Sequence, residues 1–321
     1  MEMKLVVLDG YTLNPGDLDW NVLGNFGPIT VYPITKDEEI VERIGDADIV
    51  FTNKTPITES VLEQCPNIRY VGEMATGFDN LDLEALRAHG VAVANVPDYG
   101  GIAVAQHTMA LLLELANRTM WNHQRVINGE WTGNTIPARG AWQMEMTELS
   151  GKTIGFVGFG TIAIYAARMA RAFGMRTLGY SRTERAEGRE VAEYVDLDTL
   201  LRESDVVSLH MPLNDASRNI MNRETFAKMK KGAFLISTAR GALVDEEALV
   251  EALDNGTVAG FATDVLVEEP FNMAHPLMGR EDVVLTPHIA WGPKATRARL
   301  LQICADNLEA FLKGTSLNRL V

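Results

Sequence analysis

Short apolar runs alternate with polar, helix-like segments along the whole chain. In the first hundred residues, five such runs predict strands, at 5–8, 29–32, 49–51, 70–72 and 91–94. Strands that alternate with helices are typical of parallel α/β architecture. We therefore predict a small doubly wound parallel sheet in this part of the chain.

A second, more strongly apolar series of strands follows after residue 150. It consists of six runs, at 153–157, 177–180, 206–210, 233–238, 258–263 and 283–286. Six strands are the number in a complete dinucleotide-binding sheet. The pattern also predicts a long helix over 102–118 and a last helix over about 293–313. The stretch from Trp121 to Trp142 has no clear periodicity and is expected to be irregular.

Composition narrows the class of protein. The 321 residues are too many for one simple core and suit two domains. With 43 acidic and 29 basic residues the formal net charge is −14, which disfavours nucleic acid as a partner. Cys65 and Cys304 lie outside any CxxC spacing, so neither a disulfide scaffold nor a metal site is expected. We see no leader segment and no apolar stretch of the ~20 residues that span a bilayer, so we expect a cytoplasmic protein without membrane contact.

A phosphate-binding turn is predicted at the end of the first strand of the second series. Gly158, Gly160 and Ala163 form a GxGxxA pattern that leads into a helix. The first glycine permits the tight turn, the second lets the backbone approach a pyrophosphate, and the small third residue allows close helix–strand packing. The helix would direct the N–H groups of Thr161 and Ile162 at the phosphates. The alternative is a tight turn that binds no cofactor.

The next strand favours NADP(H) over NAD(H). An NAD site usually has an acidic residue about 20 residues after the glycines, which binds the ribose 2′-hydroxyl. Here the strand is followed by Ser181, Arg182 and Thr183. Ser and Arg can bind the 2′-phosphate of NADP(H), whereas a carboxylate would repel it. NAD(H) bound without that acid, or with Glu184 in its place, is the alternative.

Three strand ends in the second half carry side chains of catalytic chemistry. Arg240 follows the fourth strand, Asp264 follows the fifth with Glu269 soon after, and His288 follows the sixth. An arginine can hold a substrate carboxylate, a histidine can exchange the proton that accompanies hydride transfer, and a carboxylate can orient that histidine. Each residue alone has an ordinary structural explanation. Together they belong to the carboxyl ends of strands in one sheet, which favours a site.

These motifs resemble those of the D-isomer-specific 2-hydroxyacid dehydrogenases, in particular the glycerate dehydrogenase/hydroxypyruvate reductase branch. The matching segments occur along nearly the whole chain, at 95–99, 104–108, 149–153, 158–163, 237–241, 264–270 and 286–291. The resemblance implies two doubly wound domains with an interdomain cleft that holds the active site. A flavodoxin-like substrate domain would comprise residues 1–100 plus 292–321, and an inserted Rossmann cofactor domain would comprise residues 101–291.

The resemblance also implies a role for individual residues. Arg240 matches the residue that binds the substrate carboxylate, His288 the acid/base, and Glu269 the partner of that histidine. Backbone N–H groups of a loop in the first domain would meet the same carboxylate, at Ala75, Thr76 and Gly77. Asp264 would bind the nicotinamide carboxamide. The other positions expected to contact the cofactor, besides the glycine turn and the residues after the second strand, are Thr108, His210, Thr238, Ala239 and His288.

We therefore predict an NADP(H)-preferring reductase of a small 2-keto acid, either hydroxypyruvate or glyoxylate. One alternative is an NAD-linked relative that acts on phosphoglycerate or lactate, although the loop at 75–80 lacks the basic residues that a phosphate needs. Another is a nucleotide-sensing binding protein on the same fold. The family places Trp131 and Trp142 in a region that helps form a dimer interface, so we expect a homodimer.

Overall fold

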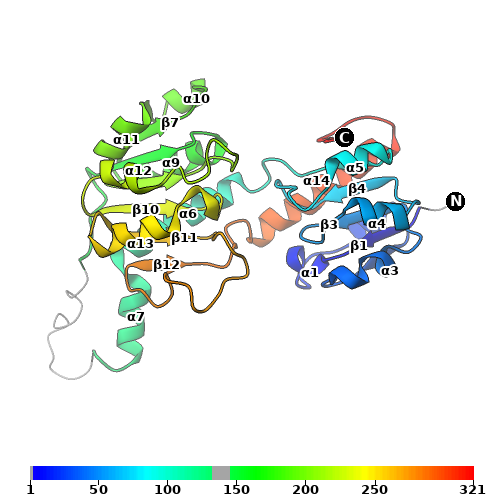
Figure 1. The fold of residues 1–321 in the computed structure, drawn as a ribbon, viewed down its shortest axis with the longest axis horizontal. Coiled ribbons are helices and arrows are strands. Elements are labelled where there is room, and N and C mark those ends of the chain that lie inside the picture. The colour runs from blue at the N-terminus through cyan, green and yellow to red at the C-terminus, as the bar shows by residue number, and fades with distance from the viewer. Residues whose placement is uncertain (1–2, 132–144) are drawn as a thin grey trace. The chain divides into compact units, whose positions relative to one another are not determined.

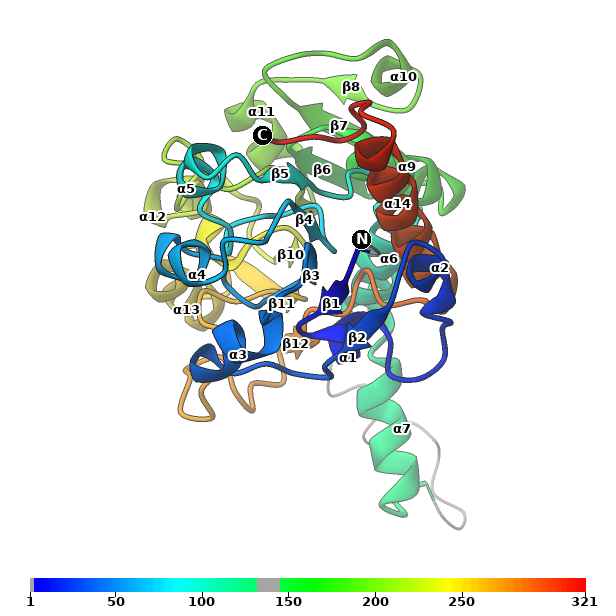
Figure 2. The same cartoon turned by 90° about the vertical axis from the view of Figure 1, so that its right-hand side faces the viewer.

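The computed structural model describes residues 3–131 and 145–321 of the chain. They form two compact units (Figure 1). Unit 1 comprises Met1–Gly100 and Trp291–Val321, and unit 2 comprises Gly101–Ala290. Each unit contains one parallel sheet with helices on its faces (Figure 2), which confirms the predicted α/β class.

Unit 1 contains the five strands that the apolar runs predict. They are β1 (Leu5–Val7), β2 (Ile29–Val31), β3 (Ile49–Thr52), β4 (Tyr70–Glu73) and β5 (Ala92–Ala94). All pair in parallel, in the order β2-β1-β3-β4-β5. This is the flavodoxin-like order, whose direction reverses between β1 and β3. Loops after these strands therefore meet at one edge of the sheet.

Helices bury both faces of this sheet. They are α1 (Gly10–Leu13), α2 (Asn21–Gly24), the 3-10 helix η1 (Asp37–Glu39), α3 (Ile40–Ile44), α4 (Glu59–Gln64), α5 (Leu83–Ala88) and α14 (Lys294–Leu312). The predicted last helix corresponds to α14, which brings the end of the chain back to unit 1. Its Leu300, Cys304 and Leu308 are fully buried against one face of the sheet. Cys65 is buried under the other face, and both thiols are free.

Unit 2 contains the six predicted strands and one more. They are β6 (Thr153–Val157), β7 (Arg176–Tyr180), β8 (Glu193–Tyr194), β9 (Val206–Leu209), β10 (Ala233–Ser237), β11 (Val258–Thr263) and β12 (Val283–Leu285). The order β12-β11-β10-β9-β6-β7-β8 is that of a dinucleotide-binding sheet, with its direction reversing between β6 and β9. The additional strand, β8, has two residues, too few to produce an apolar run.

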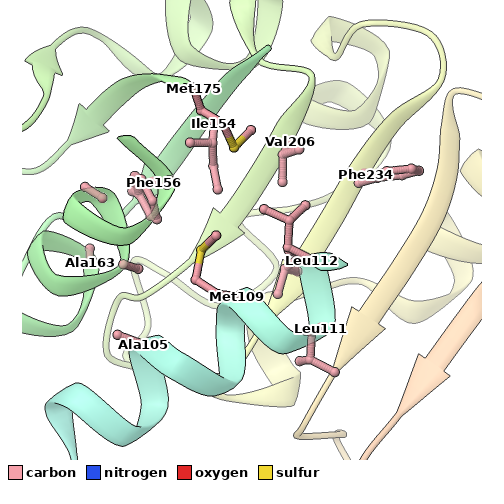
Figure 3. Close-up of a cluster of buried hydrophobic side chains, with 14 of the residues drawn as sticks. Ala105, Met109, Leu111, Leu112, Ile154, Phe156, Ala163, Met175, Val206 and Phe234 are labelled. Carbon is pink, nitrogen blue, oxygen red and sulfur yellow. The ribbon is translucent and has the colours of Figure 1, made fainter. Parts of the chain in front are cut away.

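The helices of unit 2 include the predicted long one. They are α6 (Gly101–Asn117), α7 (Thr119–Ile127), α9 (Thr161–Ala172), α10 (Ala186–Arg189), α11 (Leu197–Glu203), α12 (Arg223–Lys228), the 3-10 helix η2 (Gly241–Leu243) and α13 (Glu246–Asp254). Figure 3 shows how Ala105, Met109 and Leu112 of α6 face Phe156 and Val206 of the sheet. Burying a side chain such as Leu112 stabilises the fold by about 1.5–3 kcal/mol.

The prediction of an irregular stretch from Trp121 onward is wrong for residues 121–127, which belong to α7. Arg118 adopts a left-handed conformation with φ 52° and so separates α7 from α6. The helix extends away from the sheet of unit 2 in both views (Figures 1 and 2). With no core to face, α7 has no buried residue, which explains why its sequence lacks a clear apolar stripe. In the described parts of the chain, none of the helices has the length and hydropathy of a membrane span.

Candidate active site

The glycine turn after β6 leaves room for an anion. Gly158 has φ +90°, and a Cβ there would lie 2.5 Å from the backbone nitrogen of Met211. At Gly160 no heavy atom of the described residues, apart from its chain neighbours, lies within 4 Å of the Cβ position. The first bond of α9 runs from the N–H of Ile164 to the carbonyl of Gly160, so the preceding N–H groups have no helical partner. The sequence therefore folds into the cradle that a pyrophosphate requires.

Basic side chains surround the carboxyl end of β7. Ser181 is half-buried, and Arg182 and Thr183 are exposed directly after the strand. Arg185, which the sequence analysis missed, donates from Nη1 to Oγ1 of Thr161 at 3.1 Å. This contact places a second guanidinium beside the first turn of α9. In the sequence, Arg185 is recognisable as a second arginine three positions after Arg182.

Glu184, the alternative ribose ligand, is paired with Arg189. Glu184 accepts from both Nε and Nη2 of Arg189, at 2.9 and 2.6 Å. The two side chains are partly exposed, so the pair itself contributes little to stability. The pair nevertheless gives the Glu184 carboxylate a positively charged partner, Arg189.

His210 lies at the end of β9, where the sheet reverses direction. Its Nε2 is 2.8 Å from Oγ of Ser208, and its ring centroid is 5.6 Å from that of Phe156. Burial lowers the pKa of His210 to about 4, because the charged ring would lose its hydration. The ring is therefore neutral near pH 7.

Arg240, Asp264 and His288 follow three neighbouring strands, β10, β11 and β12. Nδ1 of His288 is 2.7 Å from Oε2 of Glu269. The other oxygen of Glu269 accepts the backbone N–H of Leu266 at 3.1 Å. Because a carboxylate can only accept here, Nδ1 of His288 carries a proton. The structure thus pairs the predicted acid/base with its predicted partner.

Asp264 holds the backbone that carries His288. The backbone N–H of His288 donates to the Asp264 carbonyl at 2.9 Å, and the carboxylate accepts from the N–H groups of Ile289 and Ala290 at 2.9 and 2.7 Å. These bonds maintain the backbone of His288 at φ +54°, a conformation that residues other than glycine rarely adopt. The resemblance implies that Asp264 binds the cofactor. The structure shows in addition that Asp264 holds the backbone of residues 288–290.

Two further side chains complete the surroundings of Asp264. Oγ1 of Thr286 donates to its carboxylate at 2.6 Å, and Nε2 of His107 lies 3.5 Å from the same oxygen. Burial alone would raise the pKa of Asp264, but the bonds from His107, Thr286 and the backbone lower it below its usual range. Asp264 is therefore a buried anion. His107 lies in the family-like segment 104–108, but no role was predicted for it from the sequence.

The loop with Arg240 is packed closely against the loop that leads to Glu269. A Cβ at Gly241 would lie 2.0 Å from the carbonyl carbon of Leu266, so only glycine allows this approach. Nη1 of Arg240 donates to the carbonyl of Ala239 at 2.9 Å. Of the predicted cofactor contacts, the structure joins Thr108 and Thr238, whose hydroxyl oxygens are 3.2 Å apart.

In unit 1, the loop after β4 has its carbonyl groups anchored to the scaffold. Nδ2 of Asn53 donates to the Met74 carbonyl at 2.6 Å, and Nδ2 of Asn95 donates to the Thr76 carbonyl at 2.8 Å. The Ala75 carbonyl accepts the N–H of Val96 at 2.9 Å. Asn53 and Asn95 follow β3 and β5, so the neighbouring strand ends support the loop from both sides. The sequence analysis did not identify them.

The backbone N–H groups of residues 75–77 in this loop, unlike its carbonyls, are not bonded to the described scaffold. Within residues 3–131 and 145–321, no acceptor bonds the backbone N–H groups of Ala75, Thr76 or Gly77. Thr76 is exposed and its two neighbours are half-buried. Backbone N–H groups without protein partners are available to donate to an anion such as a carboxylate.

The remaining predictions concern two tryptophans and a metal site. Trp131 is 60% exposed, and Trp142 lies outside the described residues. Across the part of the chain that the structure describes, no three His, Cys, Asp or Glu side chains are grouped for a metal ion.

Comparison with known proteins bears on the whole chain. Residues 109–290 match the sequence model described as D-isomer specific 2-hydroxyacid dehydrogenase, NAD binding domain. The chain is 45% identical to the hydroxypyruvate reductase of Blautia hydrogenotrophica, over 98% of this chain and 99% of that protein. It is 41% identical to the glyoxylate reductase of Aeropyrum pernix, over 86% and 83% respectively. Among solved structures, apo D-lactate dehydrogenase from Escherichia coli is similar with a TM-score of 0.89 and 29% identity, over 99% of this chain and 100% of that one.

Proposed function

This chain belongs to the family of D-isomer specific 2-hydroxyacid dehydrogenases, and on that premise we propose that it reduces hydroxypyruvate or glyoxylate with NADP(H). The observation that carries the proposal is the His288–Glu269 pair, 2.7 Å apart, on the same sheet as the glycine turn. A bound nicotinamide would supply the hydride. The residues of the chain would supply the proton, the hold on the substrate and the binding of the cofactor.

In this proposal His288 is the general acid. Its Nδ1 donates to Glu269, so the proton that it transfers to the substrate oxygen is the one on Nε2. Glu269 orients the ring through its bond to Nδ1. Asp264 fixes the backbone on which the ring is mounted. Proton transfer of this kind contributes typically 10²–10⁴-fold to a reaction rate.

Substrate binding is assigned to Arg240 and to the loop with Ala75, Thr76 and Gly77. A guanidinium binds a carboxylate with two parallel hydrogen bonds, and the same charge stabilises an oxygen that becomes negative during reduction. The N–H groups of the loop in unit 1 would provide neutral donors for a carboxylate. Residues 1–100 with 292–321 would bind substrate, and residues 101–291, which include Arg240, would bind the cofactor.

The choice of NADP(H) rests on charge. Arg182 and Arg185 both follow β7, and Arg185 contacts Thr161 at the start of α9. Glu184, which could otherwise bind a ribose hydroxyl, is paired with Arg189. The positive charge of the two arginines, together with the pairing of Glu184 with Arg189, favours a cofactor with a 2′-phosphate over one with a free 2′-hydroxyl.

The choice of substrate rests on the relatives and on the loop after β4. Relatives of this chain that are 45% and 41% identical are named hydroxypyruvate reductase and glyoxylate reductase. Residues 75–80 contain no Lys or Arg that would hold a phosphorylated acid. A small, unphosphorylated 2-keto acid is the substrate class that fits both observations.

The experiment is a turnover assay. Purified protein is mixed with NADPH or NADH and with hydroxypyruvate, glyoxylate, pyruvate or phosphohydroxypyruvate, and the nicotinamide absorbance is followed. We expect the highest kcat/KM with NADPH and hydroxypyruvate or glyoxylate. Cofactor binding without turnover of any of these acids would indicate a nucleotide sensor instead.

A homodimer is part of the proposal, through α7. This helix exposes Met120, Val126 and Ile127, by 66, 47 and 63%. Apolar side chains exposed together are typical of interfaces. Light scattering coupled to gel filtration should give twice the mass of 35.3 kDa, and Ile127→Asp should reduce it to the mass of one chain.

A further inference from the structure

A buried carboxyl group closes the base of the loop after β4. Glu73 is the last residue of that strand, and its side chain is 0% exposed. Its Oε2 accepts from Nδ2 of Asn80 at 3.0 Å, and the same Nδ2 lies 3.2 Å from the carbonyl of Thr55. Glu73 precedes Met74 and Asn80 follows Asp79. The bond therefore joins the two ends of the segment that contains Ala75, Thr76 and Gly77.

The surroundings of Glu73 favour its neutral form. Within the described residues its second oxygen, Oε1, is buried without a hydrogen-bond partner. An ionised carboxylate at this place would lose most of its hydration, and the one amide donor would replace only a small part of the hydrogen bonds to water. Burial accordingly raises the pKa of Glu73 to about 9, and the bond from Asn80 offsets only part of that rise.

The charged and titratable groups around Glu73 come from several elements. Asp9 after β1 and Asp79 in the loop disfavour its ionisation, and Lys54 after β3 favours it. The Asp9 carboxylate is occupied by the backbone N–H groups of residues 53–55. On α14, burial raises the pKa of the Cys304 thiol, so this neighbour is neutral. Among the described residues, Lys54 is the cation whose charge favours ionisation of Glu73, and the effect of burial outweighs it.

We propose that protonated Glu73 is a positioning residue for the loop that binds the substrate carboxylate, and that its ionisation loosens the hold of this loop on the substrate. The inference rests on the proposed function, in which this loop binds the carboxylate. An ionised Glu73 must reach water or a cation, and either movement breaks its bond to Asn80. The N–H groups of residues 75–77 would then lose their fixed arrangement, and substrate binding would weaken before the chemical step is affected.

The test compares the pH dependence of KM between the wild type and Glu73→Gln. Hydroxypyruvate reduction is measured from pH 7 to 10 at saturating NADPH. We expect the wild-type KM to rise about fivefold between pH 8 and 10 and the KM of the variant to stay level. Loss of the His288 proton affects both proteins equally, so it cancels in the comparison. Glu63→Gln, at an exposed position of α4, is the matched control and should follow the wild type. An equal rise of KM in all three proteins would refute the proposal.

A second measurement needs no turnover. Between its ordinary pKa and about 9, Glu73 is neutral when folded and ionised when unfolded, so rising pH destabilises the wild type. The melting temperature of Glu73→Gln minus that of the wild type should therefore increase from pH 5 to pH 9. A constant difference would mean that Glu73 is ionised in the folded protein, which would overturn the proposal. This measurement stands even if hydroxypyruvate is not turned over.

A variant at the other end of the bond covers the case in which Glu73→Gln fails to fold. Asn80→Ala removes the bond and leaves the carboxyl in place. At pH 7 it should raise the KM for hydroxypyruvate about fivefold, with kcat within twofold of the wild type. At pH 10, where Glu73 of the wild type is ionised and its bond to Asn80 is already broken, the two KM values should be similar. An unchanged KM would show that the loop does not depend on this closure.

Discussion

Gly158 and Gly160 are two positions apart and are required for different reasons. At Gly158 the backbone conformation and the nearby nitrogen of Met211 exclude any side chain, which is a requirement of folding. At Gly160 the protein itself leaves the space open. The requirement there would come from the cofactor.

This difference leads to a prediction for Gly160→Ala. Its φ of −96° is accessible to alanine, so the melting temperature should stay within about 1 °C of the wild type. The new methyl group would occupy the space for the pyrophosphate, so the KM for NADPH should rise at least tenfold. Gly158→Ala, its matched control, should lower the melting temperature. A Gly160→Ala protein that binds NADPH normally would contradict the assignment of the turn.

Cofactor choice gives a prediction for Arg182. If Arg182 binds the 2′-phosphate, Arg182→Ala removes a charged hydrogen bond worth about 1.5–3 kcal/mol. The KM for NADPH should then rise roughly tenfold or more, while the KM for NADH changes less than twofold. Steady-state kinetics with both cofactors measure the two values. Equal changes would mean that Arg182 does not distinguish them.

At the level of residues, the sequence could identify side chains with distinctive chemistry but few that support them. Glu269 and His288 were predicted as partners from a family resemblance, and the structure brings them together. Asn53 and Asn95 were not identified, because an asparagine that anchors a carbonyl has no sequence pattern of its own. Such contacts depend on which strands become neighbours.

Among the elements, the segment between β11 and β12 is attached to α13 by Glu246 at the start of that helix and by Asp254 at its end, which accepts from Nη1 of Arg280 at 2.8 Å. Glu246 accepts the N–H of Val267 at 3.4 Å through one oxygen and lies 3.1 Å from Nε2 of His275 through the other. These two contacts lie on either side of Glu269. The segment that carries Glu269, the partner of His288, is therefore held on both sides of Glu269 by the same carboxylate.

Removing this attachment should slow the reaction. We expect Glu246→Ala to reduce kcat with hydroxypyruvate about tenfold, because Glu269 is held less firmly against His288. The KM for NADPH should change less than twofold. Glu247→Ala is the control, since that neighbouring side chain is 89% exposed. Equal kcat values for the two variants would argue against a role of Glu246 in the site.

Prediction of the elements from sequence succeeded where apolar runs were long enough. The five strands of unit 1 and six of the seven in unit 2 have at least three residues each, and all of these except β2 and β12 contain three consecutive buried residues. The strand β8 has two residues, and α7 leaves the sheet. Neither is buried in a regular way, so neither produces a periodic pattern.

For the whole molecule, the chain leaves unit 1 at Gly100 and returns at Trp291. Periodicity alone predicted two sheets, but the return of the last helix to unit 1 came from the family resemblance. Contacts between residues nearly three hundred positions apart have no local signal. An example is the pair of Asp17 with Arg297 on α14, 2.7 Å apart.

The acid stability of unit 2 should depend on His210. Its pKa is lowered to about 4 by burial, so below pH 6.5 the unfolded chain binds a proton that the folded chain does not. This stabilisation is complete above pH 6.5 and is lost as the pH falls toward 4. Between pH 7 and 4.5 the loss is on the order of 2 kcal/mol.

The measurement compares His210→Gln with the wild type. Denaturant unfolding at several pH values gives the free energy of unfolding of each protein, and the wild type should lose more of it on acidification. Parallel curves for the two proteins would mean that His210 is charged or exposed when folded.

The chain has two cysteines, and both Cys65 and Cys304 are buried in unit 1. An alkylating reagent can react with them only when that unit opens, so the labelling rate measures how often unit 1 opens. NADPH, if it binds to unit 2 as proposed, would lower this labelling rate only when both units open together. Labelling with and without the nucleotide thus measures how independently the two units unfold.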